Sequence, residues 1–394
     1  MVRDVIKAFR RVRKKSRPGW KRLLRGAIGF LCGLISLVLV LLIWAWPELG
    51  TLPSGEHLEA ISMSPNYDKD RGRFVNRKQA EYDKMIAKFD YLSLMKAQIF
   101  GTQIRTPPKG LPYESSSIED FVKRTELSYI WLGHSTVLMR LDNLTILFDP
   151  IFTNAAPLPF LVPRFQEPVI SLQQLPPIDV IVISHDHYDH LDKPTVEHFL
   201  GTETKFLVPL GVSSHLIGWG VPKKSITEHD WWDKTTISGV DFHCTPSQHF
   251  SGRLGPRGSK TLWASWSVLG DSQRVFFSGD SGYDIHFQKI GERLGPFDVA
   301  FMESGQYNPI WYMAHMFPEE AVRGALELKA KYIHPIHWGM FRLSTHDWFD
   351  PPLRIRTAAS DDISVLFPKI GQEVIVSEYV SQNQPWWEIL KNTP

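Results

Sequence analysis

Four side chains that could bind a metal ion lie within six positions of this 394-residue chain. They are His185, His187, Asp189 and His190, in the run IVISHDHYDHLD, directly after an apolar segment that favours a β-strand. Imidazole and carboxylate groups suit Zn²⁺, and a loop at a strand end can turn alternate side chains toward two adjacent ions. A single histidine among the 15 of the chain would be ordinary, but this density predicts a metal site.

Further ligands are expected at the ends of other strands, because four local residues cannot complete the coordination of two ions. His249 follows the predicted strand VDFHCTPS, Asp280 follows RVFFSG, and His337 ends the predicted strand KYIHPI. These three side chains are therefore candidate ligands. Three competing residues fall within a strand or a turn and are interpreted as structural: His243, Asp271 and His334.

The elements that must position these residues form a β-rich pattern from about residue 127 onward. Short apolar runs such as TVLMRL, LTILFD, RVFFSG and EVIVS alternate with turns. Helical stretches follow some of them, notably PTVEHFL after Lys193 and PEEAVRGALELKAK from Pro318, which opens with a proline and two acids as a helix N-terminus should. The pattern predicts an α/β sandwich with helices outside packed sheets, placed at residues 116–394.

Residues 26–46 contain no charged side chain, and their 21 positions are enough to cross a bilayer as a helix. The preceding residues 1–25 hold 11 Lys and Arg against one acid, so the positive-inside rule predicts a basic cytoplasmic segment. The predicted anchor at 26–46 then places the rest of the chain on the non-cytoplasmic side, in the periplasm if the source is bacterial. A cleaved signal peptide and a buried core helix are the alternatives.

Residues 47–115 are interpreted as a spacer followed by an amphipathic helix. Residues 51–78 are polar and show little periodicity. Between 79 and 100, apolar residues recur at helical spacing with charged residues between them. This predicts one helix, whose apolar face packs on the domain or, alternatively, contacts lipid.

The formal charge of +2 conceals an asymmetry. After residue 25 the chain carries 33 basic and 41 acidic residues, a net charge near −8. A negative net charge on this part of the chain argues against a nucleic-acid partner, because phosphate binding needs a basic face.

The cysteine count argues against an internal disulfide. With Cys32 inside the apolar run, only Cys244 remains for the rest of the chain, so no internal disulfide is expected.

The order of the motifs LFDP, HDHYDH, SQH, SGDSG and IHWG resembles that of the metallo-β-lactamase superfamily. The resemblance implies a four-layer αβ/βα sandwich with two Zn²⁺ ions per chain. It assigns His185, His187 and His249 to the first zinc, Asp189, His190 and His337 to the second, and Asp280 to a bridge between them. It also implies that Asp149 in LFDP supports the ligands from behind. A water shared by two such ions becomes a hydroxide near neutral pH, which would attack the substrate directly.

Several segments, among them WLGHSTVLMRL, FFSGDSGY and HMFPEEAV, resemble the N-acylphosphatidylethanolamine-hydrolysing phospholipase D family over residues 70–365. The resemblance implies a phospholipid substrate that is cleaved to N-acylethanolamine and phosphatidic acid, and it hints at a homodimer. It further implies that Asp189, Asp280 and His315 take part in catalysis, although a capping role for His315 stays open. His134 in WLGHST matches a motif shared with sugar-phosphate lactonases, and is expected either to support the ligands or to shape a turn.

The basic loop SGRLGPRGSK follows His249, and Arg253, Arg257 and Lys260 are candidate contacts to an anionic substrate. A solvated loop is the alternative. Two other functions remain open at this point. One is a lactonase-like metallohydrolase, although an enzyme for a soluble sugar phosphate would not need a membrane segment. The other is a non-catalytic zinc-stabilised membrane protein, although the seven candidate ligands exceed the four that a structural zinc needs.

Overall fold

We describe the fold from a computed structural model of the chain, which describes residues 19–253, 258–359, 362–378 and 385–391. The chain divides into two units, residues 1–48 and residues 49–394. The first unit contains helix α2 (Gly19–Ala45), which covers nearly all of the predicted span 26–46. The helical stretch Leu23–Leu49, which includes a 3-10 turn at Trp46–Leu49 after α2, is long and apolar enough to cross a membrane. Most of the predicted basic segment, residues 1–18, lies outside the described residues.

The second unit is built on two mixed sheets of seven strands each. The strand order of the first sheet is β15-β14-β13-β12-β11-β10-β9, and that of the second is β16-β3-β4-β5-β6-β7-β8. The strands of the first sheet are β9 (Lys234–Ile237), β10 (Val240–Thr245), β11 (Ser265–Leu269), β12 (Arg274–Phe277), β13 (Phe297–Glu303), β14 (Ala330–Ile336) and β15 (Ser364–Val365). The strands of the second sheet are β3 (Ser128–Trp131), β4 (Val137–Leu141), β5 (Leu144–Phe148), β6 (Val180–Val182), β7 (Lys205–Pro209), β8 (Ile226–His229) and β16 (Glu373–Ile375).

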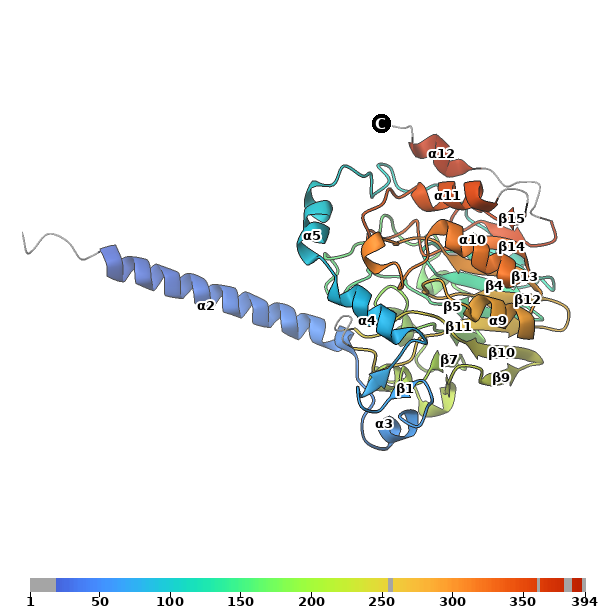
Figure 1. Cartoon of the computed structure of the whole chain (residues 1–394), viewed down its shortest axis with the longest axis horizontal. Helices are drawn as coiled ribbons and strands as arrows, with labels where there is room; N and C mark the ends of the chain where they lie inside the picture. Colours follow the sequence, from blue (N-terminus) through green and yellow to red (C-terminus); the bar gives the residue numbers. More distant parts are fainter. Residues whose placement is uncertain (1–18, 254–257, 360–361, 379–384, 392–394) are drawn as a thin grey trace, which may run out of the picture. The chain divides into compact units, whose positions relative to one another are not determined.

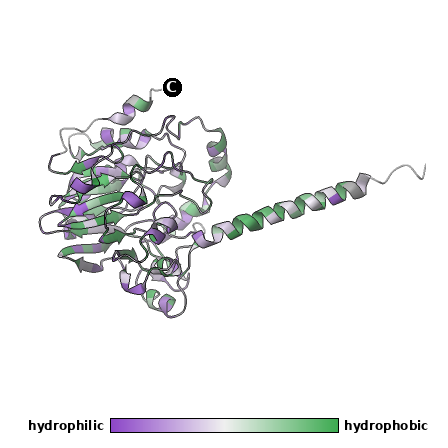
Figure 2. Ribbon diagram, turned by 180° about the vertical axis from the view of Figure 1, so that it is seen from behind, coloured by the Kyte–Doolittle hydropathy of each residue, from purple (hydrophilic) through white to green (hydrophobic). Residues whose placement is uncertain are grey.

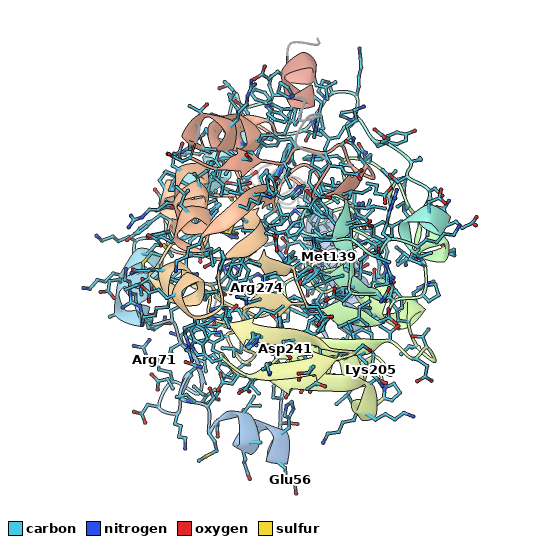
Figure 3. All side chains as sticks on the ribbon, turned by 90° about the vertical axis from the view of Figure 1, so that its right-hand side faces the viewer. Glu56, Arg71, Met139, Lys205, Asp241 and Arg274 are labelled. Atoms are coloured by element: carbon cyan, nitrogen blue, oxygen red, sulfur yellow. The ribbon has the colours of Figure 1, made fainter. Side chains whose placement is uncertain are left out.

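Alternate side chains of the second sheet enter two different cores, because successive residues of a strand point to opposite faces. On β4, Met139 joins the core between the sheets, whereas Leu138 joins the core on the outer face. Phe301 of β13 reaches the inter-sheet core from the opposite side, with its ring 4.8 Å from that of Tyr129. Figure 3 shows Met139 among densely packed side chains, while Glu56 lies at the periphery.

Helices cover both outer faces of the paired sheets. Helices α10 and α11 contact the first sheet at β13, β14 and β15, and α9 lies against α10 (Figure 1). Phe121, Val196 and Leu216, one from each of α6, α7 and α8, join the core outside the second sheet. The predicted four-layer αβ/βα sandwich is confirmed. The bounds of the helices are α6 (Ile118–Phe121), α7 (Lys193–His198), α8 (Ser213–Gly218), α9 (His286–Arg293), α10 (Pro318–Glu327), α11 (Asp350–Ala359) and α12 (Trp386–Lys391).

The segment interpreted as a spacer is folded onto the sandwich. It carries helix α3 (Gly55–Ile61) and a hairpin of β1 (Tyr67–Asp68) and β2 (Arg73–Phe74), and it buries Ile61 and Phe74 against Trp263. The helix expected over 79–100 is two helices, α4 (Gln79–Ala87) and α5 (Tyr91–Phe100). The break has a local cause, because the side chain of Asp90 accepts a hydrogen bond from the backbone N–H of Ser93 and so begins a new helix.

Candidate metal centre

The loops that carry the seven predicted ligands meet at one edge of the sandwich. The loop 183–192 follows β6, and His249, Asp280 and His337 follow β10, β12 and β14. Strands β12, β13 and β14 run parallel, as do β5 and β6, so their carboxyl ends share an edge of each sheet. The arrangement places residues separated by up to 152 positions, His185 and His337, in one cluster.

Three histidines and one aspartate form the first group of donor atoms: His185, His187, His249 and Asp280. One ligand atom from each lies within 4.8 Å of the others. His187 Nδ1 lies 2.8 Å from His185 Nε2 and 3.3 Å from His249 Nε2. Three nitrogens therefore face a common point, as the coordination of one ion requires.

Asp189, His190 and His337 form a second group, which also includes His134. Asp189 Oδ2 lies 3.2 Å from His337 Nε2 and 3.4 Å from His190 Nε2. The carboxylate of Asp280 lies between the two groups, with Oδ1 3.2 Å from His190 Nε2 and Oδ2 3.6 Å from His249 Nε2. Its position is the one that a bridging ligand would need.

Two residues behind the ligands orient them. Asp149 is fully buried, and its Oδ2 lies 2.8 Å from His190 Nδ1, while Ser184 donates its backbone N–H and its hydroxyl to the same carboxylate. His134 Nε2 lies 2.9 Å from Asp189 Oδ2. A partner of this kind fixes which ring nitrogen faces the metal. Asp149 therefore contacts a predicted ligand from behind, and His134 lies within hydrogen-bond distance of another.

Glu303 is a functional candidate that the sequence analysis missed. It ends β13 and is fully buried, and its Oε2 lies 2.9 Å from His315 Nδ1 and 3.5 Å from His337 Nδ1. His315 in turn stacks on His337 with ring centroids 5.1 Å apart. The available signal was an acid at the end of a buried strand, in FMESG, but one such residue without a motif is weak evidence.

The carboxylates raise the pKa values of the histidines, whereas burial lowers them. Burial holds the pKa of His185 and of His249 well below the usual range. Burial also opposes the charged form of His337, but Asp280 and Asp189 raise its pKa to about 10. Burial would likewise raise the pKa of Asp280, yet His190 and His337 hold it well below its usual range.

The site fits a bound cation. Among the described residues, the buried atoms His190 Nε2 and Asp280 Oδ1 have no hydrogen-bond partner, although they lie 3.2 Å apart. A metal ion would satisfy both lone pairs, and buried polar atoms are rarely left without a partner. A donor set of five histidines and two aspartates is of the kind that binds zinc.

The basic loop after His249 is arranged differently from the prediction. Arg253 is buried, its guanidinium donates to the backbone oxygens of Asp186 and Leu191, and it lies 4.0 Å above the ring of Tyr188. It therefore braces the ligand loop and does not present its charge to a substrate. Lys260 is half-buried and donates to the backbone oxygen of Gly72, and Arg257 lies outside the described residues. The competing residues His243, Asp271 and His334 belong to none of the groups of donor atoms found among the described residues.

Comparison with known proteins agrees with this geometry. A model of the β-lactamase superfamily domain matches residues 145–338. A protein of Caenorhabditis elegans named N-acyl-phosphatidylethanolamine-hydrolyzing phospholipase D 1 is 35% identical over 256 residues, which cover 61% of this chain and 72% of the relative. The chain belongs to this phospholipase D family, within the metallo-β-lactamase superfamily. The family assignment makes the clustered His and Asp residues a candidate site of a metal-dependent hydrolase.

Two further relatives extend the comparison. An uncharacterized protein of Mycobacterium tuberculosis is 41% identical over 341 residues, covering 84% of this chain and 90% of the relative. The solved structure of a metallo hydrolase from Ignicoccus hospitalis matches with a TM-score of 0.50 at 21% identity, and covers 64% of this chain and 98% of that one. At that identity, the structural match supports the fold alone.

Proposed function

We propose that this chain is a membrane-anchored, zinc-dependent phosphodiesterase that hydrolyses N-acylphosphatidylethanolamine-like phospholipids to N-acylethanolamine and phosphatidic acid. The main support is the convergence of seven metal-type donors in a chain that is 35% identical to the nematode phospholipase D. The identity covers 72% of that relative, so the likeness is not confined to a short motif.

Two ions would be held by the two groups of donors. We assign His185, His187 and His249 to one ion, Asp189, His190 and His337 to the other, and Asp280 to both. A bound pair of zinc ions lowers the pKa of a shared water and polarises the phosphoryl oxygen.

His315 is the residue best placed to meet the substrate phosphate. Its side chain is 14% exposed, whereas that of His337 beneath it is 1% exposed. Glu303 fixes the ring by accepting a hydrogen bond from Nδ1, so that Nε2 is left to face the substrate. The role of His315 is therefore to orient the phosphate, and an imidazolium ring would also donate a hydrogen bond from Nε2 to a phosphate oxygen.

The surface beside His315 is suited to lipid. The loop of residues 309–315 packs against α4, where Met85 shares an apolar cluster with Met313. Phe89, between α4 and α5, stacks on Trp311. Helix α5, which follows, exposes Leu92 by 67% and Met95 by 56%. Figure 2 shows that hydrophobic residues make up much of the α5 ribbon. Exposed apolar side chains on a helix favour contact with a bilayer surface. This supports a lipid substrate that is taken from a membrane.

The proposal is tested with the purified full-length chain and N-acylphosphatidylethanolamine in vesicles, with products identified by mass spectrometry. Asp280→Asn should lower the rate about a thousandfold or more, because several kcal/mol of charge stabilisation depend on the metal pair. Asp271→Asn is the matched control, since Asp271 lies in an exposed turn, and it should retain full activity. Equal activity of Asp280→Asn and the wild type would refute the metal mechanism.

The lipid assignment needs a test of its own. Replacing Leu92 and Met95 by Gln should slow hydrolysis of vesicle lipid, but should leave hydrolysis of a soluble bis-nitrophenyl phosphodiester unchanged. Hydrolysis of a sugar-phosphate lactone with no release of N-acylethanolamine would instead favour the lactonase-like function.

We also propose that residues 49–394 lie on the non-cytoplasmic side, which a C-terminal reporter active only outside the cytoplasm would test.

A further inference from the structure

Arg342 lies in the segment that follows His337, and it shares cavity walls with two other arginines, Arg105 and Arg164. Arg164 and Arg342 line a cavity of about 220 Å³, together with Thr106, Leu161, Val162, Pro163 and Phe165. Arg342 and Phe165 also line a smaller neighbouring cavity, to which Arg105 contributes. No carboxylate lines the first cavity among the described residues.

The positive charges of this cluster are not neutralised within the described part of the chain. None of the three arginines has a carboxylate within ion-pair distance there, although the charges of Asp192 and Glu167 act on Arg164 from farther away. Asp192 already accepts hydrogen bonds from Phe152 and Thr153. Burial lowers the pKa of Arg164 to about 10, and burial with the charge of Arg342 lowers the pKa of Arg105. An anion entering the cavity would relieve this repulsion.

Arg164 is held in a fixed orientation. Its Nη1 donates to the backbone oxygen of Ile151 at 2.8 Å, its Nε donates to that of Gln166 at 3.3 Å, and its guanidinium lies 5.5 Å from the centre of the Phe341 ring. A guanidinium has five N–H donors, so three remain. Donors in a rigid fork match the oxygens of a phosphate group.

The cavity adjoins the metal centre without sharing its residues. The Phe341 ring lies between the two, since its centroid is also 5.0 Å from that of His134, which contacts Asp189. On the outer side, Leu161 is 55% exposed and Ile104 is 49% exposed. Cations next to exposed apolar side chains suit the headgroup region of an anionic lipid.

We propose that Arg164 and Arg342, with Arg105 at the edge, form a binding site for a phosphate group that is separate from the metal centre. The phosphate can be free or can belong to a lipid headgroup, and the apolar rim favours the lipid. The lipid form of the proposal rests on the proposed function, whereas phosphate binding itself does not.

Binding is measured by isothermal titration calorimetry on the metal-loaded full-length chain at fixed ionic strength. Three probes separate the sources of phosphate: inorganic phosphate, glycerol 3-phosphate and dihexanoyl phosphatidic acid. Arg342→Gln and Arg164→Gln should each weaken binding about tenfold, the effect of one charge-assisted hydrogen bond. Arg323→Gln, which removes an exposed arginine from α10, is the matched control and should bind as the wild type does.

The variants also keep the outcomes distinct. Arg164→Gln removes the bond to Ile151 and can lower stability, whereas Arg342 is exposed, so Arg342→Gln tests the site without that complication. In the Asp280→Asn background, hydrolysis should be lost while the arginine-dependent binding persists, which separates this site from the proposed function. Tighter binding of the dihexanoyl lipid than of glycerol 3-phosphate identifies the lipid as the source. Phosphate binding that is unchanged in Arg342→Gln and in a folded Arg164→Gln overturns the proposal.

Discussion

Asp149→Asn is the most informative perturbation of the residues behind the metal centre. The wild-type carboxylate accepts three hydrogen bonds, from the Ser184 backbone N–H at 2.7 Å, the Ser184 hydroxyl at 2.5 Å and His190 Nδ1 at 2.8 Å. In the variant, an amide nitrogen replaces one oxygen and donates instead of accepting. If that nitrogen faces His190 Nδ1, the ring proton must move to Nε2. That atom lies 3.2 Å from Asp280 Oδ1 and is the one that would bind metal.

The expected loss of metal affinity is 10- to 100-fold, as for other residues that orient a ligand, which corresponds to about 1.4–2.7 kcal/mol. The loss should concern one of the two ions, because His190 belongs to only one group of donors. Stability without metal should fall by about 2 kcal/mol, the contribution of a hydrogen bond to a charged group.

The assay is a competitive titration of zinc against a chromophoric chelator, with metal content per chain measured in parallel. The control is Asp192→Asn, because Asp192 is also buried but accepts hydrogen bonds from Phe152 and Thr153 and from no histidine. That variant should lose stability and keep its zinc affinity. If folded Asp149→Asn binds both ions as tightly as the wild type, Asp149 does not orient His190 in the way inferred here.

Three further predictions concern stability. The hydrogen bond that His57 Nε2 donates to the Glu228 carboxylate raises the pKa of His57, so this pair stabilises the fold at pH values below about 6.5 and its contribution is lost as pH rises through the folded pKa. His57→Gln should therefore lower the unfolding free energy by about 1 kcal/mol at pH 5.5 and by less at pH 9, and an equal loss at both pH values would contradict this. Chelation should lower the melting temperature but leave the circular dichroism spectrum unchanged, because the hydrophobic core between the sheets contains none of the proposed ligands. Loss of the spectrum would show that the metal is needed to fold. Phe301→Ala should lower the free energy of unfolding in urea by about 3–5 kcal/mol, whereas Leu326→Ala, at a side chain that is 42% exposed, should lower it by less than about 1 kcal/mol. Similar losses in the two variants would show that Phe301 does not belong to the core between the sheets.

The sheets and the ligand loops could be predicted because their signals are local. An apolar strand followed by HDHYDH indicates both the strand and the candidate ligand loop at its end within a dozen residues. His249, Asp280 and His337 became candidates because each follows or ends a predicted strand, and the family resemblance then assigned them to two ions. The structure brings their side chains together. Periodicity alone cannot supply such pairings, since it carries no information about which strands are neighbours.

The errors arose where a tertiary contact decides the role of a residue. The stretch SGRLGPRGSK has the composition of a solvated basic loop, but Arg253 folds inward onto the carbonyls of Asp186 and Leu191. Arg164 and Arg342 are 178 positions apart and belong to no motif, so only the fold places them in one cavity. Glu303 escaped notice for the same reason, because its partner His315 lies beyond the following loop.

Backbone conformation at the site shows why its geometry depends on the docking of the two sheets. His134, Asp149 and His337 have φ values of 51°, 37° and 65°, in the left-handed region that residues other than glycine seldom adopt. Such a conformation costs about 1–3 kcal/mol and persists only where the surroundings impose it. At His134 the surroundings are known: its N–H donates to the Trp338 carbonyl, and its own carbonyl accepts from the His337 N–H. These bonds join the turn after β3, in the second sheet, to the end of β14, in the first. The second group of donors is therefore assembled by the same contacts that hold the two sheets in register at this edge.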